Sequence, residues 1–176
     1  MTRAIVLAVM LLAAGWKEHG KPVPDTAWAK SDGDFGAMLV FTDKPDALFA
    51  AWEKPGPAVR MSETPDAVRG VPIVAVIFFA GCAADAHGHC QTTVHFTAQG
   101  PDGKPYGQPL NGELWADKPP PDKEQMQLSA GNMAIVIEPK DPLGEYKVKA
   151  EITDTVTKKT MSLERSFTAV EAPKKG

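Results

Sequence analysis

The stretch Val71–Ala98 constrains the fold more than any other part of the chain, because two strand-like runs flank a short loop there. The first run, Ile73–Ala80, is apolar at every position, which predicts a central strand that is buried on both faces. The second run alternates, with Val94 and Phe96 on one side and threonine and histidine residues on the other. This alternation predicts a strand with one face exposed to water.

The loop begins at Cys82 and ends at Cys90, which are the only cysteines in the chain. Along uninterrupted strands Cys82 shares the parity of Val76 and Cys90 shares that of Val94, so both sulfurs are expected to point toward the same layer. We interpret the two runs as one hairpin and the two cysteines as a local disulfide. A bridge across a loop of this size stabilises a small domain by roughly 2.5 kcal/mol in the chain-entropy account.

The same loop carries side chains that suggest a different interpretation. Asp85, His87 and His89 lie between the cysteines, and zinc or copper accepts carboxylate, imidazole and thiolate ligands. The spacing is not that of a common zinc motif, and a formed disulfide is a poor metal ligand. The disulfide is therefore the preferred interpretation, with no cofactor expected, and metal binding at this loop is the alternative.

The first fifteen residues differ in composition from the rest of the chain. Arg3 provides a positive start, Ala4–Ala14 is continuously apolar, and Gly15 follows, which is the pattern of a secretory signal peptide at residues 1–15. The apolar run is shorter than the roughly 20 residues that a spanning helix needs, so no stable membrane anchor is expected after cleavage. These features predict a periplasmic or secreted bacterial protein in an oxidising compartment.

Residues 33–170 are expected to form one domain, preceded by a flexible extension at residues 16–32 and followed by a flexible tail at residues 171–176. A short helix is expected at about residues 44–53, with Asp43 as its N-cap. The formal net charge is −3 and the lysines are dispersed. The chain therefore offers no basic surface for a phosphate backbone, which argues against nucleic acid as a partner.

The last third of the chain alternates most clearly. Every second position is apolar in the segments 133–137 and 146–152, which predicts two half-buried strands. A turn at residues 154–159 leads into a last strand, in which Arg165 interrupts the apolar positions. We expect a β-bulge at Arg165.

The passage Ile137–Tyr146 between these two strands reads I-x-P-x-D-P-x-G-x-Y. It resembles the corner between the fifth and sixth strands of immunoglobulin-like domains, where a tyrosine hydroxyl bonds back to the backbone. The resemblance implies an all-β fold, an immunoglobulin-like β-sandwich, with a structural corner formed by Tyr146, Asp141 and Gly144.

The resemblance extends over about residues 35–170 and departs from antibody domains in one respect. Val148 stands where an antibody domain places its core cysteine, so the inter-sheet disulfide of antibody domains is absent. More loosely, the chain resembles small exported bacterial sandwich proteins to which no activity is assigned. That resemblance implies a fold and a location, and no substrate.

Enzymatic motifs are missing from the sequence. It contains no G-x-S-x-G elbow, no P-loop and no glycine-rich dinucleotide-binding turn, and the spacing of the cysteines is not that of a C-x-x-C redox motif. We expect a non-catalytic exported module of the bacterial envelope that binds an unknown protein or envelope component, or has a structural role. Such a module would act through loops or an exposed edge strand.

Overall fold

The computed structural model describes residues 17–18, 21–22, 24–53, 63–121 and 126–173. The predicted signal peptide at residues 1–15 lies outside these ranges, as does the end of the predicted tail. Within the described ranges, no helix is long and apolar enough to cross a membrane.

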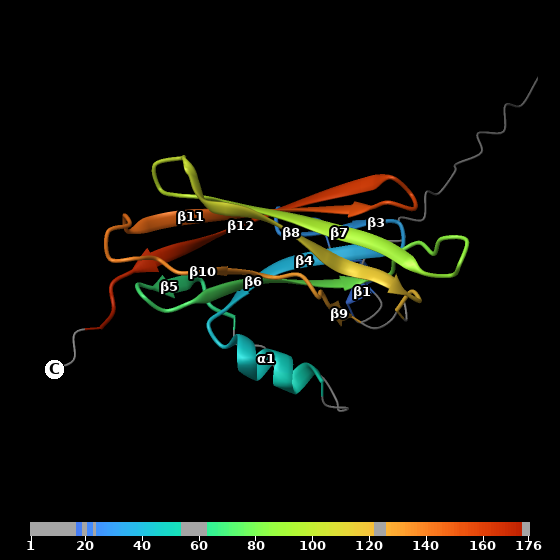
Figure 1. The fold of residues 1–176 in the computed structure, drawn as a ribbon, viewed down its shortest axis with the longest axis horizontal. Helices are drawn as coiled ribbons and strands as arrows, with labels where there is room; N and C mark the ends of the chain where they lie inside the picture. Colours follow the sequence, from blue (N-terminus) through green and yellow to red (C-terminus); the bar gives the residue numbers. More distant parts are fainter. Residues whose placement is uncertain (1–16, 19–20, 23, 54–62, 122–125, 174–176) are drawn as a thin grey trace, which may run out of the picture.

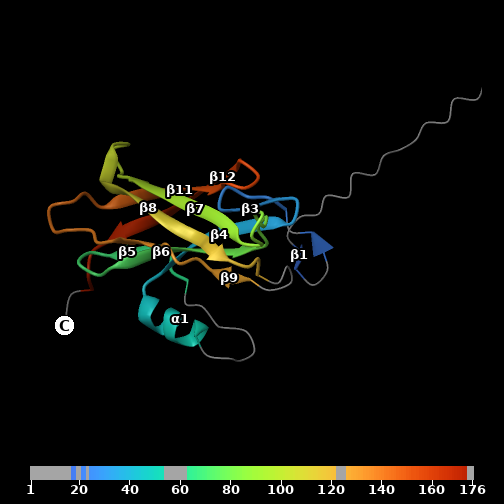
Figure 2. The same cartoon turned by 45° about the vertical axis from the view of Figure 1, so that its right-hand side comes forward.

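Two five-stranded sheets account for most of the described chain (Figures 1 and 2), which confirms the all-β prediction. The first sheet has the order β10-β6-β4-β3, with β9 also beside β6, and the second has the order β5-β12-β11-β7-β8. The first sheet contains β3 (Ala29–Asp32), β4 (Phe35–Thr42), β6 (Ile73–Ala80), β9 (Gln127–Leu128) and β10 (Met133–Ile135). The second contains β5 (Asp66–Val68), β7 (Cys90–Gln99), β8 (Pro105–Lys118), β11 (Gly144–Asp154) and β12 (Lys159–Val170). Two further strands, β1 (Lys17–Glu18) and β2 (Lys21–Pro22), pair with each other.

The strand β6 is buried on both faces, as its uninterrupted apolar sequence predicts. Its odd-numbered residues, such as Ile77, join the core between the two sheets, and its even-numbered residues, such as Val76, pack under the helix α1 (Pro45–Trp52). Leu48 of α1 is buried against this outer face, and Trp52 lies with its ring centroid 5.3 Å from that of Phe78. Burial of a leucine side chain contributes roughly 1.5–3 kcal/mol, which holds so short a helix against the sheet.

The inner face of the second sheet follows the predicted alternation. Tyr146, Val148, Ala150 and Ile152 of β11 are all buried in the core between the sheets. The Tyr146 ring stacks on the Phe167 ring of β12, with centroids 5.4 Å apart. Val148, the second residue after Tyr146, is fully buried in this core.

The prediction that β6 and β7 form a hairpin is wrong, because the two strands belong to different sheets. Residues 81–89, which we call the crossover loop, pass from the first sheet to the second. The parity argument fails at Gly81, whose φ of +71° ends the strand alternation one residue before Cys82. Cys82 and Cys90 nevertheless form the predicted disulfide, which closes the crossover loop.

Two further expectations near the N-terminus differ from the structure. Residues 29–32 are not a flexible extension, because β3 pairs with β4 across a tight turn in which Gly33 has a φ of +65°. Asp43 does not cap the helix: the N-cap position is Lys44, and no side chain caps the helix there. The hydroxyl of Thr42 instead accepts a hydrogen bond from the backbone N–H of Lys44.

The bulge expected at Arg165 is also absent, since β11 and β12 stay in continuous register through the pair Val148 and Arg165. Arg165 reaches across to the first sheet, where it donates a 3.0 Å hydrogen bond to the Leu39 carbonyl oxygen. Its guanidinium also lies 4.5 Å from the centre of the Trp28 ring. A cation with partners on the facing sheet fits an inward position without a change of register.

Candidate functional site

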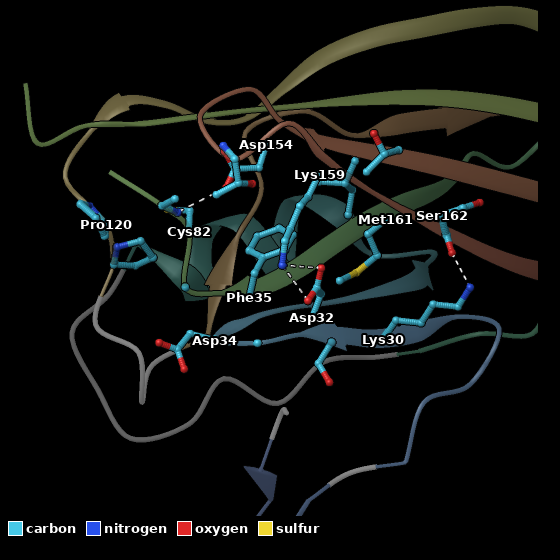
Figure 3. Close-up of a pocket in the computed structure, with 18 of the residues that line it drawn as sticks. Lys30, Asp32, Asp34, Phe35, Cys82, Pro120, Asp154, Lys159, Met161 and Ser162 are labelled. Carbon is cyan, nitrogen blue, oxygen red and sulfur yellow. Dashed lines mark hydrogen bonds and ion pairs between the residues drawn. The ribbon is translucent and has the colours of Figure 1, made fainter. Parts of the chain in front are cut away.

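A cleft of about 600 Å³ opens at one end of the two sheets (Figure 3). Its walls come from both sheets, with the β3–β4 turn on one side, the β11–β12 turn on the other, and the crossover loop and a proline segment between them. The lining residues are Asp25, Lys30, Ser31, Asp32, Gly33, Asp34, Phe35, Gly81, Cys82, Ala83, Pro120, Pro121, Ile152, Asp154, Thr157, Lys159, Thr160, Met161 and Ser162.

The crossover loop connects the walls of this cleft. The backbone of Gly81 lies so close to the first wall that an added Cβ would stand 2.3 Å from the Asp34 carbonyl oxygen. On the second wall, the backbone N–H of Ala83 donates to the carboxylate of Asp154 at 3.4 Å, and Thr155 donates its backbone N–H to the Gln91 carbonyl at 3.0 Å. The disulfide therefore lies within the segment that connects the two turns.

Two lysine side chains span the gap between the sheets at the cleft. Lys159 of β12 contacts both carboxylate oxygens of Asp32 of β3, each at 2.8 Å. Lys30 of β3 donates to the carbonyl oxygen of Ser162 at 2.7 Å. The Lys159 and Asp32 side chains are 57% and 55% exposed, so their ion pair contributes about 0–1 kcal/mol. A ligand can displace this contact at small cost.

The residues of the alternative metal site lie on the crossover loop outside the cleft lining. The Asp85 carboxylate accepts hydrogen bonds from the backbone N–H groups of His87, at 2.8 Å, and His89, at 3.0 Å, and from the Gln91 amide at 3.2 Å. These contacts, the His89 N–H first, lower the pKa of Asp85 below its ordinary value. Asp85 thus acts as the cap of the loop turn.

The structure does not bring the residues of the crossover loop together as a set of metal ligands. The sulfurs of Cys82 and Cys90 are bonded to each other, which removes them as thiolate ligands. Among the described residues, no three His, Cys, Asp or Glu side chains are grouped so that they could hold a metal ion. His95 lies on the neighbouring strand, where its Nδ1 is 2.7 Å from the side-chain oxygen of Asn111.

The predicted corner lies at the opposite end of β11. The hydroxyl of Tyr146 donates to the Pro142 carbonyl oxygen at 2.8 Å, which is the backbone contact that the resemblance implies. Gly144 has a φ of +129° and its position faces Pro101, so a side chain there would be strained. Asp141 accepts from the Glu138 backbone N–H at 2.8 Å and thereby closes the turn.

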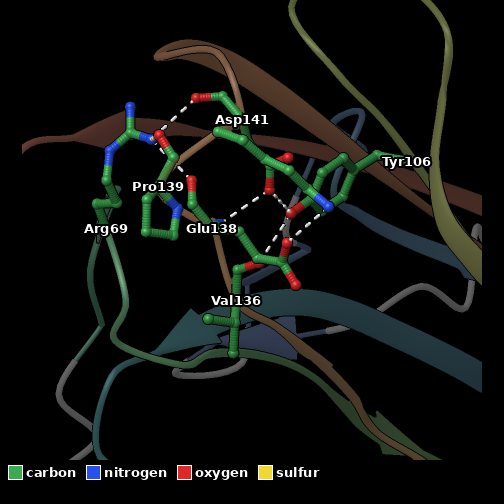
Figure 4. A network of polar contacts seen from close by, with 7 residues as sticks. Arg69, Tyr106, Val136, Glu138, Pro139 and Asp141 are labelled. Atoms are coloured by element: carbon green, nitrogen blue, oxygen red, sulfur yellow. Dashed lines mark hydrogen bonds and ion pairs between the residues drawn. The ribbon is translucent and has the colours of Figure 1, made fainter.

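Two residues that the sequence did not indicate complete this corner (Figure 4). The hydroxyl of Tyr106 on β8 donates a hydrogen bond to the Asp141 carboxylate at 2.5 Å. The hydroxyl oxygen of Tyr106 also lies 2.8 Å from the carbonyl oxygen of Val136. Arg69, just after β5, donates through one nitrogen to the carbonyl oxygens of Glu138 at 2.7 Å and Asp141 at 3.0 Å, and to that of Pro139. Its Nε lies 3.1 Å from Glu171, an ion pair without hydrogen-bond geometry.

The electrostatics of the corner follow from these contacts. Burial first, and then the bond to Asp141, raise the pKa of Tyr106 far above its ordinary value. The same hydroxyl, followed by the Glu138 N–H, lowers the pKa of Asp141. Burial likewise raises the pKa of Tyr146. The polar side chains of the corner thus hold one another and the backbone, whereas the cleft is open.

No protein-family model and no curated protein matches the chain. Among solved structures, it is similar to a family 123 glycoside hydrolase from Clostridium perfringens, described for glycolipid glycan hydrolysis, with a TM-score of 0.43 and 11% sequence identity. The similarity covers 79% of this chain and 28% of that chain. A similarity at this level carries no argument about fold family or activity.

Proposed function

We propose that this protein is an exported, immunoglobulin-like module of the bacterial envelope that binds a ligand without catalysis, through the cleft at the disulfide-bonded end. The observation that carries the proposal is the cleft itself, which is formed by turns of both sheets. Its volume of about 600 Å³ is within the usual range for small-molecule and peptide sites. Loops held by a rigid sheet scaffold are the usual place for binding residues.

The immunoglobulin-like part of the proposal is supported by topology. The second sheet places β12, β11, β7 and β8 in the order of strands G, F, C and C′ of a variable-type domain, with β5 parallel to β12 at the edge. Tyr146 lies near the start of β11, the strand in the position of F, as a tyrosine corner requires. In the same comparison, β6 and β7 correspond to strands B and C, which lie in opposite sheets.

Export is supported by the disulfide and by the apolar run Ala4–Ala14. Disulfides persist in oxidising compartments such as the bacterial periplasm and are rare in the cytosol. Cell fractionation with N-terminal sequencing tests this part. We expect periplasmic or secreted protein that begins near residue 16, and a cytoplasmic protein with an intact Met1 would contradict export.

The cleft is favoured over an edge strand as the binding surface because the sheet edges are poorly suited to pairing. Among the described strands, β10 and β5 at the edges have three residues each and β3 has four. The longer edge strand β8 is interrupted by Pro109 and by register shifts against β7. Short strands, prolines and bulges are the usual protection of sheet edges against added strands.

Blocking the cleft tests the binding function. Thr157→Trp places a large side chain on the exposed cleft rim, and Thr168→Trp places the same side chain on β12 outside the cleft. Each variant is incubated with envelope extract as the ligand source. We expect Thr157→Trp to lose the ligand and Thr168→Trp to retain it. We also expect the ligand eluted from the protein to have the same mass as it has in the extract. Equal retention by both variants would contradict binding in the cleft, and a ligand recovered with altered mass would contradict the non-catalytic assignment.

A further inference from the structure

We propose that the cleft selects uncharged ligands with an apolar body over ligands that carry an ammonium or a carboxylate group. This inference rests on the proposed function, since it names the ligand class of the same cleft. It follows from two properties of the lining: an apolar floor, and charged side chains that are already engaged by groups of the protein.

The floor of the cleft is apolar and belongs to the core (Figure 3). Ile152 and Met161, which are 1% and 9% exposed, come from the two strands of the β11–β12 hairpin. Phe35, at the start of β4, is half-buried, and its ring centroid lies 6.4 Å from that of Phe79 in the core. The disulfide and two prolines complete the walls. An apolar ligand body that covers this surface removes it from water, which is favourable whatever head group the ligand carries.

Three of the four carboxylates in the lining are engaged by groups other than the two cleft lysines or are otherwise not free. Asp154 is 5% exposed and accepts hydrogen bonds from three backbone N–H groups of the crossover loop and its own turn. Asp25 accepts from the backbone N–H of Ser31 at 3.0 Å and from its hydroxyl at 3.4 Å. Asp34 is engaged as well. These carboxylates therefore do not offer an unsatisfied charge to a ligand.

The fourth carboxylate and the two lysines are engaged across the gap between the sheets. Lys159 contacts both carboxylate oxygens of Asp32, and Lys30 donates to the carbonyl oxygen of Ser162. A ligand ammonium at Asp32 would take the place of Lys159, and a ligand carboxylate at Lys159 would take the place of Asp32. Either exchange replaces one exposed ion pair by another, while the charged head group loses hydration in an apolar cleft. An uncharged ligand leaves the pair in place and avoids this loss.

Three probes with one apolar body and different head groups test this selectivity. They are 2-phenylethanol, 2-phenylethylamine and 3-phenylpropionate, titrated at pH 7 into the disulfide-bonded protein and followed by amide NMR shifts at residues 31–35 and 157–162. We expect the alcohol to bind about tenfold more tightly than either ion, because only the alcohol enters without giving up the hydration of a charge.

Two variants test whether the pair between Asp32 and Lys159 is the cause. Lys159→Gln leaves the Asp32 carboxylate without its lysine, so the affinity for the amine should rise about fivefold relative to that for the alcohol. Asp32→Asn leaves the Lys159 ammonium without its carboxylate, so the affinity for 3-phenylpropionate should rise in the same way. Lys149→Gln, which removes the comparable exposed pair with Glu151 outside the cleft, is the control and should leave all the ratios unchanged.

The results that would overturn the inference are distinct from those that test cleft binding. An ion that binds as tightly as the alcohol, or a ratio that stays unchanged in Lys159→Gln or in Asp32→Asn, overturns the inference and leaves cleft binding intact. If none of the probes shifts the cleft residues, the inference fails, while the extract experiment with Thr157→Trp and Thr168→Trp decides the proposed function separately.

Discussion

The two ends of β11 are supported in different ways. The strand runs about 35 Å from Gly144 at the corner to Asp154 at the cleft. At the corner, Tyr106, Asp141 and Arg69 form hydrogen bonds with each other or with the turn backbone. At the cleft, the two turns are joined through the crossover loop and its disulfide, and a cavity remains between them.

The comparison indicates how stability and binding are separated in this molecule. The corner uses side-chain to backbone hydrogen bonds, which fix a turn. A smaller hollow of about 370 Å³, lined in part by Tyr106, Glu138 and Asp141, lies beside it. The cleft end uses a covalent bridge and a close backbone contact at Gly81, which hold the walls without filling the space between them. A binding site between two sheets needs this second kind of support, because side chains that filled the gap would remove the site.

The largest expected effect comes from Gly81 in the crossover loop. Gly81→Ala forces a Cβ to 2.3 Å from the Asp34 carbonyl oxygen at a positive φ, so we expect a loss of about 3 kcal/mol in the free energy of unfolding. Gly88→Ala in the same loop has a φ of +82° and no atom within 4 Å of the new Cβ, so about 1 kcal/mol is expected. Urea unfolding of both variants measures the difference, and equal losses would contradict the close contact.

The disulfide should have the next largest effect. Replacing Cys82 and Cys90 together by serine is expected to lower the free energy of unfolding by roughly 2.5 kcal/mol, because a closed loop no longer restricts the unfolded chain. Because the crossover loop also carries the cleft walls, amide exchange should rise more at residues 81–89 and 154–157, through local opening, than at the corner, where the rise should follow only the loss of global stability. A rise at the corner of equal size would show that the two ends are not independent.

A double-mutant cycle tests the corner. Tyr106→Phe and Asp141→Ala each remove one partner of the 2.5 Å hydrogen bond, and Tyr106→Phe is expected to cost about 1.5 kcal/mol. The coupling energy should be about 1 kcal/mol, since either change removes the same contact. Additive losses in urea unfolding would show that the bond does not contribute to stability.

Acid should affect the corner through Asp141. Its pKa is lowered in the folded protein, so its contribution to stability is present at pH values above the ordinary carboxyl pKa and is lost as pH falls through the lowered value. Unfolding measured between about pH 6 and pH 3 should therefore show a shallower decline in Asp141→Asn than in the unchanged protein. Asp85→Asn is the comparison at the cleft end, because the pKa of Asp85 is also lowered. Parallel pH profiles for the unchanged protein and Asp141→Asn would contradict the assignment.

The smallest effect on stability is expected at the exposed ion pair of the cleft. Lys159→Ala should change the free energy of unfolding by less than about 0.5 kcal/mol, as should Lys149→Ala, which removes the comparable exposed pair with Glu151. A loss above about 1 kcal/mol for Lys159→Ala alone would show that this side chain holds the sheets together and cannot be displaced by a ligand.

Much of the fold could be predicted from the sequence because its signals are local. The unbroken apolar run of β6, the alternation of β11 and the helix near Pro45 each depend on neighbours within a few residues. The disulfide pairing followed from there being two cysteines close in sequence. The hairpin prediction failed because a nine-residue connection suits a turn within one sheet as well as a crossing between two.

The cleft could not be predicted, because no segment of the chain contains it. Asp32 and Lys159 meet across 127 residues of sequence, and the Pro120 wall comes from a third region. The corner could be predicted only in part from the sequence. Its turn and Tyr146 lie in one passage, whereas Tyr106 lies 35 residues before Asp141 and carries no local signal. Arg165 was misassigned for a similar reason, since its partner Leu39 is on the facing sheet.

The most direct test of the account is to map where small ligands bind on the whole disulfide-bonded protein. Amide NMR shifts recorded during titration with a set of small apolar probes such as 2-phenylethanol should change at residues 31–35, 81–83 and 154–162, which line the cleft or adjoin it, and remain unchanged at residues 137–146. Shifts centred on the corner or along the β8 and β10 edges, with the cleft unaffected, would contradict the claim that the open end of β11 is the binding end.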